Sequence, residues 1–195
     1  ADINKFISIF SKVKCKKNEI LINNNQVCDK IFYVERGALR AFYIDEKGIE
    51  KTRLISVEHQ FCANWASFHN LSKNTELIQS LESSIVYYTT HSDFYSLVHS
   101  SFELHKIYSK ILEKFHIYQI KRFEFFSNYS LAKRVEKVEK YFPNLKSRIN
   151  NRVLASFLHT TPEHFSYLKS RLTQLTSYIF ILKDKFGEFD YFMLI

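Results

Sequence analysis

The residues best suited to chemistry in this sequence lie in one short stretch, RVLASFLHTTPEHFSYLKSRL, from Arg152 to Leu172. Thr161 can cap a helix with its hydroxyl, Pro162 suits the first helical position, and Glu163 suits the positive end of the helix dipole. A helix is therefore predicted to begin here, with apolar residues at three- and four-residue spacing on one face. The apolar positions are Phe165, Leu168, Leu172 and Leu175, and the opposite face carries Glu163, Tyr167, Ser170 and Gln174, flanked by His164, Ser166 and Arg171. Such a polar face can hydrogen-bond to the edges of DNA bases.

A shorter apolar face precedes this helix. Val153, Leu154, Phe157 and Leu158 fall on one side of a predicted first helix, and a three-residue corner joins the two helices. Two helices packed across such a corner are typical of the helix-turn-helix, whose second helix lies in the major groove. An ordinary helical hairpin is the alternative that this stretch leaves open.

The charge of the chain is concentrated around this motif. Residues 1–100 carry 12 Lys and Arg against 11 Asp and Glu, whereas residues 121–172 carry 11 against 4, a local net charge of +7 out of the chain's +8. Local basicity of this kind is expected of a protein that neutralises DNA phosphates. A solvated basic helix face is the alternative.

Composition limits the class of protein. The 195 residues are 46% hydrophobic and include 19 Phe and 12 Tyr but 3 Gly, which predicts globular domains with ring-rich cores. Cys15, Cys28 and Cys62 are scattered, so neither a disulfide framework nor a metal or iron–sulfur site is indicated. No secretory signal or membrane-spanning run is evident, and a cytoplasmic protein is expected. No nucleophile elbow, phosphate loop or ligand cluster is present, so neither an enzyme nor a cofactor is expected.

The pattern along the chain changes twice. Ile3, Phe6, Ile7 and Phe10 predict a short amphipathic helix that lysines close, and residues 19–90 then read as about seven short strands of an antiparallel barrel or sandwich. Gly37 and Gly48 end two predicted turns that join neighbouring strands. The strand segments are EILI, KIFYVE, ALRAFYI, IEKTRLI, QF, ELIQSLE and SIVYYT.

From Ser92 to about Tyr141 the chain reads as helix, with a break near Asn128. Apolar residues there recur every three or four positions, which suggests the seam of a coiled coil between two copies of the chain. A single long helix packed on its own β domain is the alternative. The predicted seam residues are Leu104, Tyr108, Ile111, Phe115 and Tyr118.

This order of elements resembles the CRP/FNR family of bacterial transcription regulators over almost the whole chain. The likeness is clearest in IFYVERGALRAFY, which is similar to part of the family's cyclic-nucleotide-binding β-roll, and in the YFP and TPE elements around the helix-turn-helix. The resemblance implies an α+β fold with a jelly-roll-like antiparallel β-roll (residues 1–100), a dimerisation helix (101–127) and a helix-turn-helix domain (128–195). It also implies a homodimer that binds double-stranded operator DNA, with RNA polymerase as a further partner and no membrane.

The resemblance also assigns roles in DNA binding. Base-reading residues would be Glu163, Ser166, Tyr167 and Ser170, and phosphate-holding residues would be Arg152, Thr161, His164, Lys169 and Arg171. Two positions depart from the family pattern. His159 stands where the family most often has Gly and would need a left-handed backbone. Tyr167 stands where the family has its principal base-reading Arg, so the guanine contact of that Arg is missing.

The effector region departs further. The family's Gly-Glu pair and phosphate-clamping Arg are replaced by residues around Cys62, Asn64 and Asn74, while Glu76 adds a carboxylate that would repel a phosphate. Cyclic AMP is therefore not the expected ligand, and Trp65 completes a candidate pocket for an unknown small-molecule effector. A ligand-sensing or protein-interaction module without specific DNA binding stays open as an alternative function. Two aromatic runs in residues 177–195 suggest a C-terminal hairpin.

Overall fold

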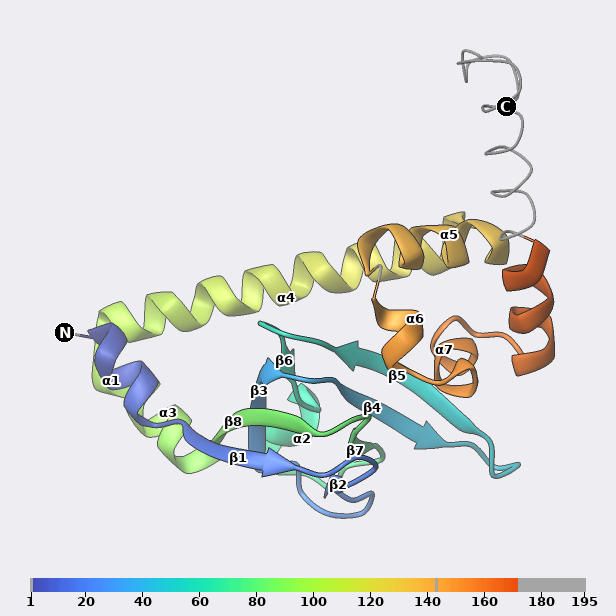
Figure 1. Ribbon diagram of the computed structural model, residues 1–195. Coiled ribbons are helices and arrows are strands. Elements are labelled where there is room, and N and C mark those ends of the chain that lie inside the picture. The colour runs from blue at the N-terminus through green and yellow to red at the C-terminus, as the bar shows by residue number, and fades with distance from the viewer. Residues whose placement is uncertain (1, 143, 172–195) are drawn as a thin grey trace, which may run out of the picture.

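The computed structural model describes residues 2–142 and 144–171, so the predicted C-terminal hairpin, Leu172, Gln174 and Leu175 lie outside the described residues (Figure 1). Two four-stranded antiparallel sheets, with strand orders β1-β8-β3-β6 and β2-β7-β4-β5, form a β-roll. The strands are β1 (Ser11–Cys15), β2 (Ile20–Ile22), β3 (Lys30–Arg36), β4 (Leu39–Ile44), β5 (Glu50–Ser56), β6 (Phe61–Cys62), β7 (Leu77–Ser80) and β8 (Ser84–Thr90). The helices labelled in Figure 1 are α1 (Asp2–Ser8), α2 (Trp65–Asn70), α3 (His91–Ser100), α4 (Phe102–Asn128), α5 (Leu131–Tyr141), α6 (Leu145–Arg148) and α7 (Asn151–Phe157).

The predicted strands are confirmed, and one strand was missed. β1 lies in the segment that the sequence assigned to the lysine-rich end of the first helix, yet it pairs with β8 from Ser11 to Cys15. Its pattern has period two, because Cys15 is buried and Val13 half-buried while Lys12 and Lys14 are exposed. β1 is an edge strand, where exposed lysines discourage pairing with another chain.

The roll is closed by apolar side chains between its sheets and by two glycine turns. Val34, Leu39 and Val86 are fully buried in its core. Both predicted turn glycines have positive φ, +107° at Gly37 and +76° at Gly48. At Gly37 a side chain would collide with Ser84, so the turn requires glycine for space as well as for φ.

The predicted helical half contains one more break than expected. Ser101 ends α3 and caps α4, because its hydroxyl accepts a hydrogen bond from the Leu104 N–H at 3.2 Å. The 27-residue α4 then runs along the roll for about 40 Å. Figure 1 shows it as the long helix that connects the N-terminal elements with α5.

The inner face of α4 packs on its own chain, as in the alternative that the sequence left open. Leu104 is buried, and the Tyr108 hydroxyl lies 3.2 Å from that of Tyr95 on α3. Ile111 lines an apolar gap in the roll, and the Phe115 ring lies 5.8 Å from the ring of Trp65. Four of the five predicted seam residues therefore pack on other residues of the chain, and Tyr118, 43% exposed, interacts electrostatically with Arg53 and Arg122. Sequence periodicity identifies an apolar face but not the surface that covers it.

The helix-turn-helix region shares a hydrophobic core with the β-roll. Ala38, Ile55 and Leu81 of the roll belong to the same buried cluster as residues of α5, α6, α7 and the turns that follow α6 and α7, namely Val135, Val138, Leu145, Ile149, Val153, Leu154 and Leu158. Figure 1 shows α7 beside β5. The two units are therefore not separated by a solvent-filled hinge.

Polar contacts fix the orientation of the two units. The Ser156 hydroxyl of α7 accepts a hydrogen bond from the Thr52 N–H and donates one to the Glu50 carbonyl of β5, both at 2.8 Å. Arg148 of α6 donates to both Glu58 oxygens at 3.0 and 2.7 Å and to Glu82 at 2.6 Å. The sequence did not predict these contacts, since their partners are 66 to 106 residues apart in the chain.

Because the core is shared, a destabilising substitution in the helix-turn-helix should also destabilise the roll. Leu154 is fully buried, so Leu154→Ala should lower the free energy of unfolding by about 2–5 kcal/mol. The only tryptophan, Trp65, lies on α2 of the roll, and its fluorescence during urea unfolding should report this loss. Leu71→Ala, at a 49% exposed leucine, is the control and should change stability by no more than about 0.5 kcal/mol. An unchanged Trp65 transition in Leu154→Ala would show that the two units unfold independently.

Candidate nucleic-acid interface and effector region

The second helix of the motif begins where the sequence predicts. Residues 162–171 are helical, and the Thr161 hydroxyl accepts a hydrogen bond from the His164 N–H at 3.2 Å. The pKa of Glu163 is lowered by a hydrogen bond from its own backbone N–H and by one from the Thr161 hydroxyl. The helix therefore presents an ionised carboxylate in its first turn at neutral pH.

The structure divides this helix into a buried and an exposed face. Phe165 is 1% exposed and belongs to the shared core. The four predicted base-reading residues, Glu163, Ser166, Tyr167 and Ser170, are all exposed. The exposed face is therefore free of contacts with the roll that would prevent it from entering a groove.

The predicted phosphate-holding residues surround this face. Arg152 at the start of α7, Thr161, His164 and Arg171 are exposed, whereas Lys169 is half-buried. The Arg171 Nη1 atom donates to the Tyr167 hydroxyl at 3.1 Å. This contact joins Tyr167, which is predicted to read a base, to Arg171, which is predicted to hold a phosphate.

The corner of the motif has the backbone that the sequence predicts. His159 has φ of +58°, in the left-handed region that favours glycine. Its ring stacks on Phe126 of α4 with centroids 4.2 Å apart and an interplanar angle of 11°. Burial and the nearby guanidinium groups of Arg122 and Arg134 lower its pKa. The neutral ring thus contacts α4, which a glycine could not do.

In the region predicted to bind an effector, three of the predicted pocket residues form one hydrogen-bonded cluster. The Asn64 side-chain amide donates to Asn74 Oδ1 at 2.7 Å and to Glu76 Oε2 at 3.0 Å. Asn74 Oδ1 also accepts from the Glu76 N–H at 3.0 Å. Asn74 and Glu76 are 1% and 5% exposed, so these two side chains are closed to solvent, whereas Asn64 is half-buried.

The charge of Glu76 is balanced within the chain, contrary to what the sequence predicts. Glu76 is not an uncompensated carboxylate, because Arg53 of β5 pairs with it through two nitrogens and also donates to the Ala63 carbonyl at 3.2 Å. Burial alone would lower the pKa of Arg53, but its hydrogen bond and charge interaction with Glu76 raise it overall. Residue spacing gave no signal for this pair, since it depends on which strands lie together.

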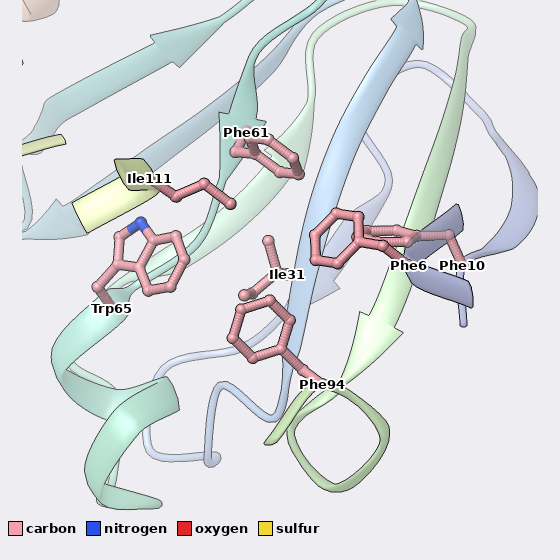
Figure 2. A pocket seen from close by; sticks show the side chains of 7 residues that line it. All are labelled: Phe6, Phe10, Ile31, Phe61, Trp65, Phe94 and Ile111. Carbon is pink, nitrogen blue, oxygen red and sulfur yellow. The ribbon is translucent and has the colours of Figure 1, made fainter. Parts of the chain in front are cut away.

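Cys62 and Trp65 are packed into the roll. Cys62 is fully buried, and burial raises its pKa to about 12, so its thiol is protonated at neutral pH. Trp65 lines a small apolar gap beneath α4, with Phe94 and Ile31 among its neighbours (Figure 2).

Within the described residues, no group of three His, Cys, Asp or Glu side chains is arranged to hold a metal ion. None of the helices in the described part of the chain is long and apolar enough to cross a membrane.

No protein-family model and no curated protein matches this chain. Solved structures match it over most of its length, with TM-scores of 0.70 for FixK2 from Bradyrhizobium japonicum and 0.69 for a protein from Eubacterium rectale described as a transcriptional regulator of the CRP/FNR family. FixK2 is 11% identical, with 86% of each chain covered, and the E. rectale protein is 16% identical, with 90% of this chain and 83% of that chain covered.

A third match is the c-di-GMP-responsive global regulator CLP from Xanthomonas campestris, with a TM-score of 0.63 and 11% identity. It covers 89% of this chain and 91% of its own. The chain therefore has the fold of CRP/FNR regulators, an antiparallel β-roll followed by a long helix and a helix-turn-helix, and the predicted fold class is confirmed.

The Arg53–Glu76 pair predicts a large penalty when one partner is removed. Arg53→Met leaves a buried carboxylate without its cation and should lower the free energy of unfolding by about 2–3 kcal/mol, since 26% of the Arg53 side chain is exposed. The double variant Arg53→Met/Glu76→Gln should recover part of this loss in urea unfolding. Lys12→Ala, which breaks an exposed pair with Glu35, is the control and should cost less than about 1 kcal/mol. If Arg53→Met lowers the free energy of unfolding no more than Lys12→Ala does, the Arg53–Glu76 pair does not stabilise the fold as proposed.

Proposed function

We propose that this chain is a homodimeric transcription regulator that reads an operator half-site with residues 162–171. The observation that carries the proposal is the exposed polar face of this helix, on a fold that matches CRP/FNR regulators over most of the chain. A helix buried on one side by Phe165 and polar on the other is the arrangement that a recognition helix needs. The proposed partners are double-stranded operator DNA and RNA polymerase.

Two kinds of contact would hold the DNA. Exposed cations around the helix, with Arg152 on α7 as the clearest, would bind phosphates and set the orientation of the protein. Glu163 and Tyr167 would face the base edges. A carboxylate with a lowered pKa can accept a hydrogen bond from the amino group of cytosine.

Dimerisation would use the outer face of α4. Ile117, Ile120 and Phe123 are 51%, 46% and 73% exposed, and they lie on the side of α4 opposite Ile111. A helix that is apolar on two sides is normally buried on both, and the β-roll covers only one of them. A second copy of the chain is the partner that this outer face supports.

The β-roll would serve a ligand other than cyclic AMP. Arg53, Asn64, Asn74 and Glu76 satisfy one another, so a cyclic phosphate would have to displace hydrogen bonds that the chain already makes. Asn74 also offers no charge to the phosphate. The effector that this region would bind is a small molecule without a phosphate.

The proposed dimer surface can be tested by substituting a charged residue into it. Phe123→Glu places two carboxylates in an apolar interface, where unpaired burial costs several kcal/mol, so the variant should sediment as a monomer. Ile44→Glu, at a 50% exposed residue of β4, is the matched control and should leave the dimer unchanged. Ile111→Glu should instead lower the melting temperature, because Ile111 packs on its own chain. A Phe123→Glu variant that remains a dimer would exclude this face.

Operator reading can be tested by selection from randomised duplexes with the wild-type protein. Enrichment of a two-fold symmetric sequence is expected. Arg152→Ala should weaken binding to all duplexes by a similar factor and reduce the slope of log affinity against log salt by about one. If no sequence is enriched, the chain is a ligand-sensing or protein-interaction module on the same fold.

A further inference from the structure

Tyr167 and Arg171 form a contact on the exposed face of the second helix. Arg171 Nη1 donates to the Tyr167 hydroxyl at 3.1 Å, and the guanidinium carbon lies 5.7 Å from the centroid of the tyrosine ring. Residues four apart are neighbours on a helix surface, so this pair is compatible with the helix remaining straight. Tyr167 is 55% exposed, so the pair is accessible to a ligand.

The position of the pair around the helix determines where the guanidinium points. At about 100° per residue, Tyr167 lies about 40° from Glu163, and Arg171 lies about 40° beyond Tyr167. Arg171 alone would therefore point toward the flank of the exposed face, where a phosphate backbone would lie. Its bond to the Tyr167 hydroxyl draws the guanidinium back toward the middle of that face, where base edges would lie.

The bond also leaves the edge of the guanidinium formed by Nε and Nη2 available to donate hydrogen bonds. Tyr167 takes one N–H of Nη1, while Nε and Nη2 keep their parallel donors. Two parallel donors are the arrangement that pairs with O6 and N7 of guanine in the major groove. The tyrosine ring and hydroxyl restrict a flexible side chain before DNA arrives, which lowers the entropy lost on binding.

We propose that Arg171, positioned by Tyr167, reads a guanine of the operator. This inference rests on the proposed DNA-binding function and changes the role of Arg171 from phosphate holding to base reading. The contact restores a guanine reader to a helix whose position 167 lacks an arginine. Glu163 and Arg171 are eight residues apart, about 12 Å along the helix. The half-site should thus contain a cytosine read by Glu163 and a guanine about three to four base pairs away, at 3.4 Å per step.

The test compares wild type, Arg171→Lys and Tyr167→Phe in selection and in affinity measurements on duplexes with guanine or adenine at the enriched position. Arg171→Lys keeps the charge but loses the two-donor fork, so preference for guanine should fall by roughly 5- to 150-fold while non-specific affinity and salt slope stay unchanged. Tyr167→Phe removes only the hydroxyl and should reduce the same preference, by a smaller factor. Arg36→Lys, at an exposed arginine of β3 outside the proposed DNA-binding face, is the matched control and should keep the preference.

Two results would overturn the inference, and they are distinguishable. If the wild type selects an operator but Arg171→Lys keeps its guanine preference, Arg171 does not read the base. Failure of the wild type to select any sequence would instead reject the proposed function, and this inference with it. Melting temperatures should match in all variants, since these side chains lie on the exposed face.

Discussion

Burial of one apolar face shared by the β-roll and the helix-turn-helix is the constraint on which the rest of this structure depends. Val153, Leu154 and Phe165 cannot be covered by the short helices α6 and α7 alone, and Ala38, Ile55 and Leu81 of the roll complete their core. Once this core forms, the polar face of residues 162–171 has to point outward, because a helix with Phe165 inside exposes the opposite side. The orientation of the candidate DNA-binding face thus follows from packing.

β5 connects this core to the polar cluster of Asn64, Asn74 and Glu76. Thr52 bonds α7 through Ser156, and the next residue, Arg53, bonds Glu76 in the polar cluster. Thr52 makes its bond with the backbone N–H and Arg53 makes its bond with the side chain, so one short strand contacts both sites. A change in the partners of Arg53 would act on a strand that also contacts the helix-turn-helix, with no long path between them.

The long helix α4 has a comparable double role within the chain. Its inner face completes the aromatic packing around Trp65, Phe94 and Tyr95, while Phe126 near its end stacks on His159 at the corner of the motif. The left-handed backbone at His159 is unfavourable for a non-glycine residue. The stacked ring offsets that cost by a contact that fixes the corner against α4.

The sequence by itself determined the order of elements, because periodicity and caps are local. Seven of the strands, the two glycine turns, the Thr161 cap and the polar face from Glu163 to Ser170 could all be predicted from neighbouring residues. β1 was missed, although Lys12, Val13, Lys14 and Cys15 alternate, because the lysines also suit the last turn of the helix before it. Only the tertiary structure decided what covers each face: α4 lies on its own roll, Arg53 neutralises Glu76, and Arg148 joins α6 to Glu58 and Glu82. These contacts join residues that are distant in the chain, and residue types alone do not show which distant partners a packed core brings together.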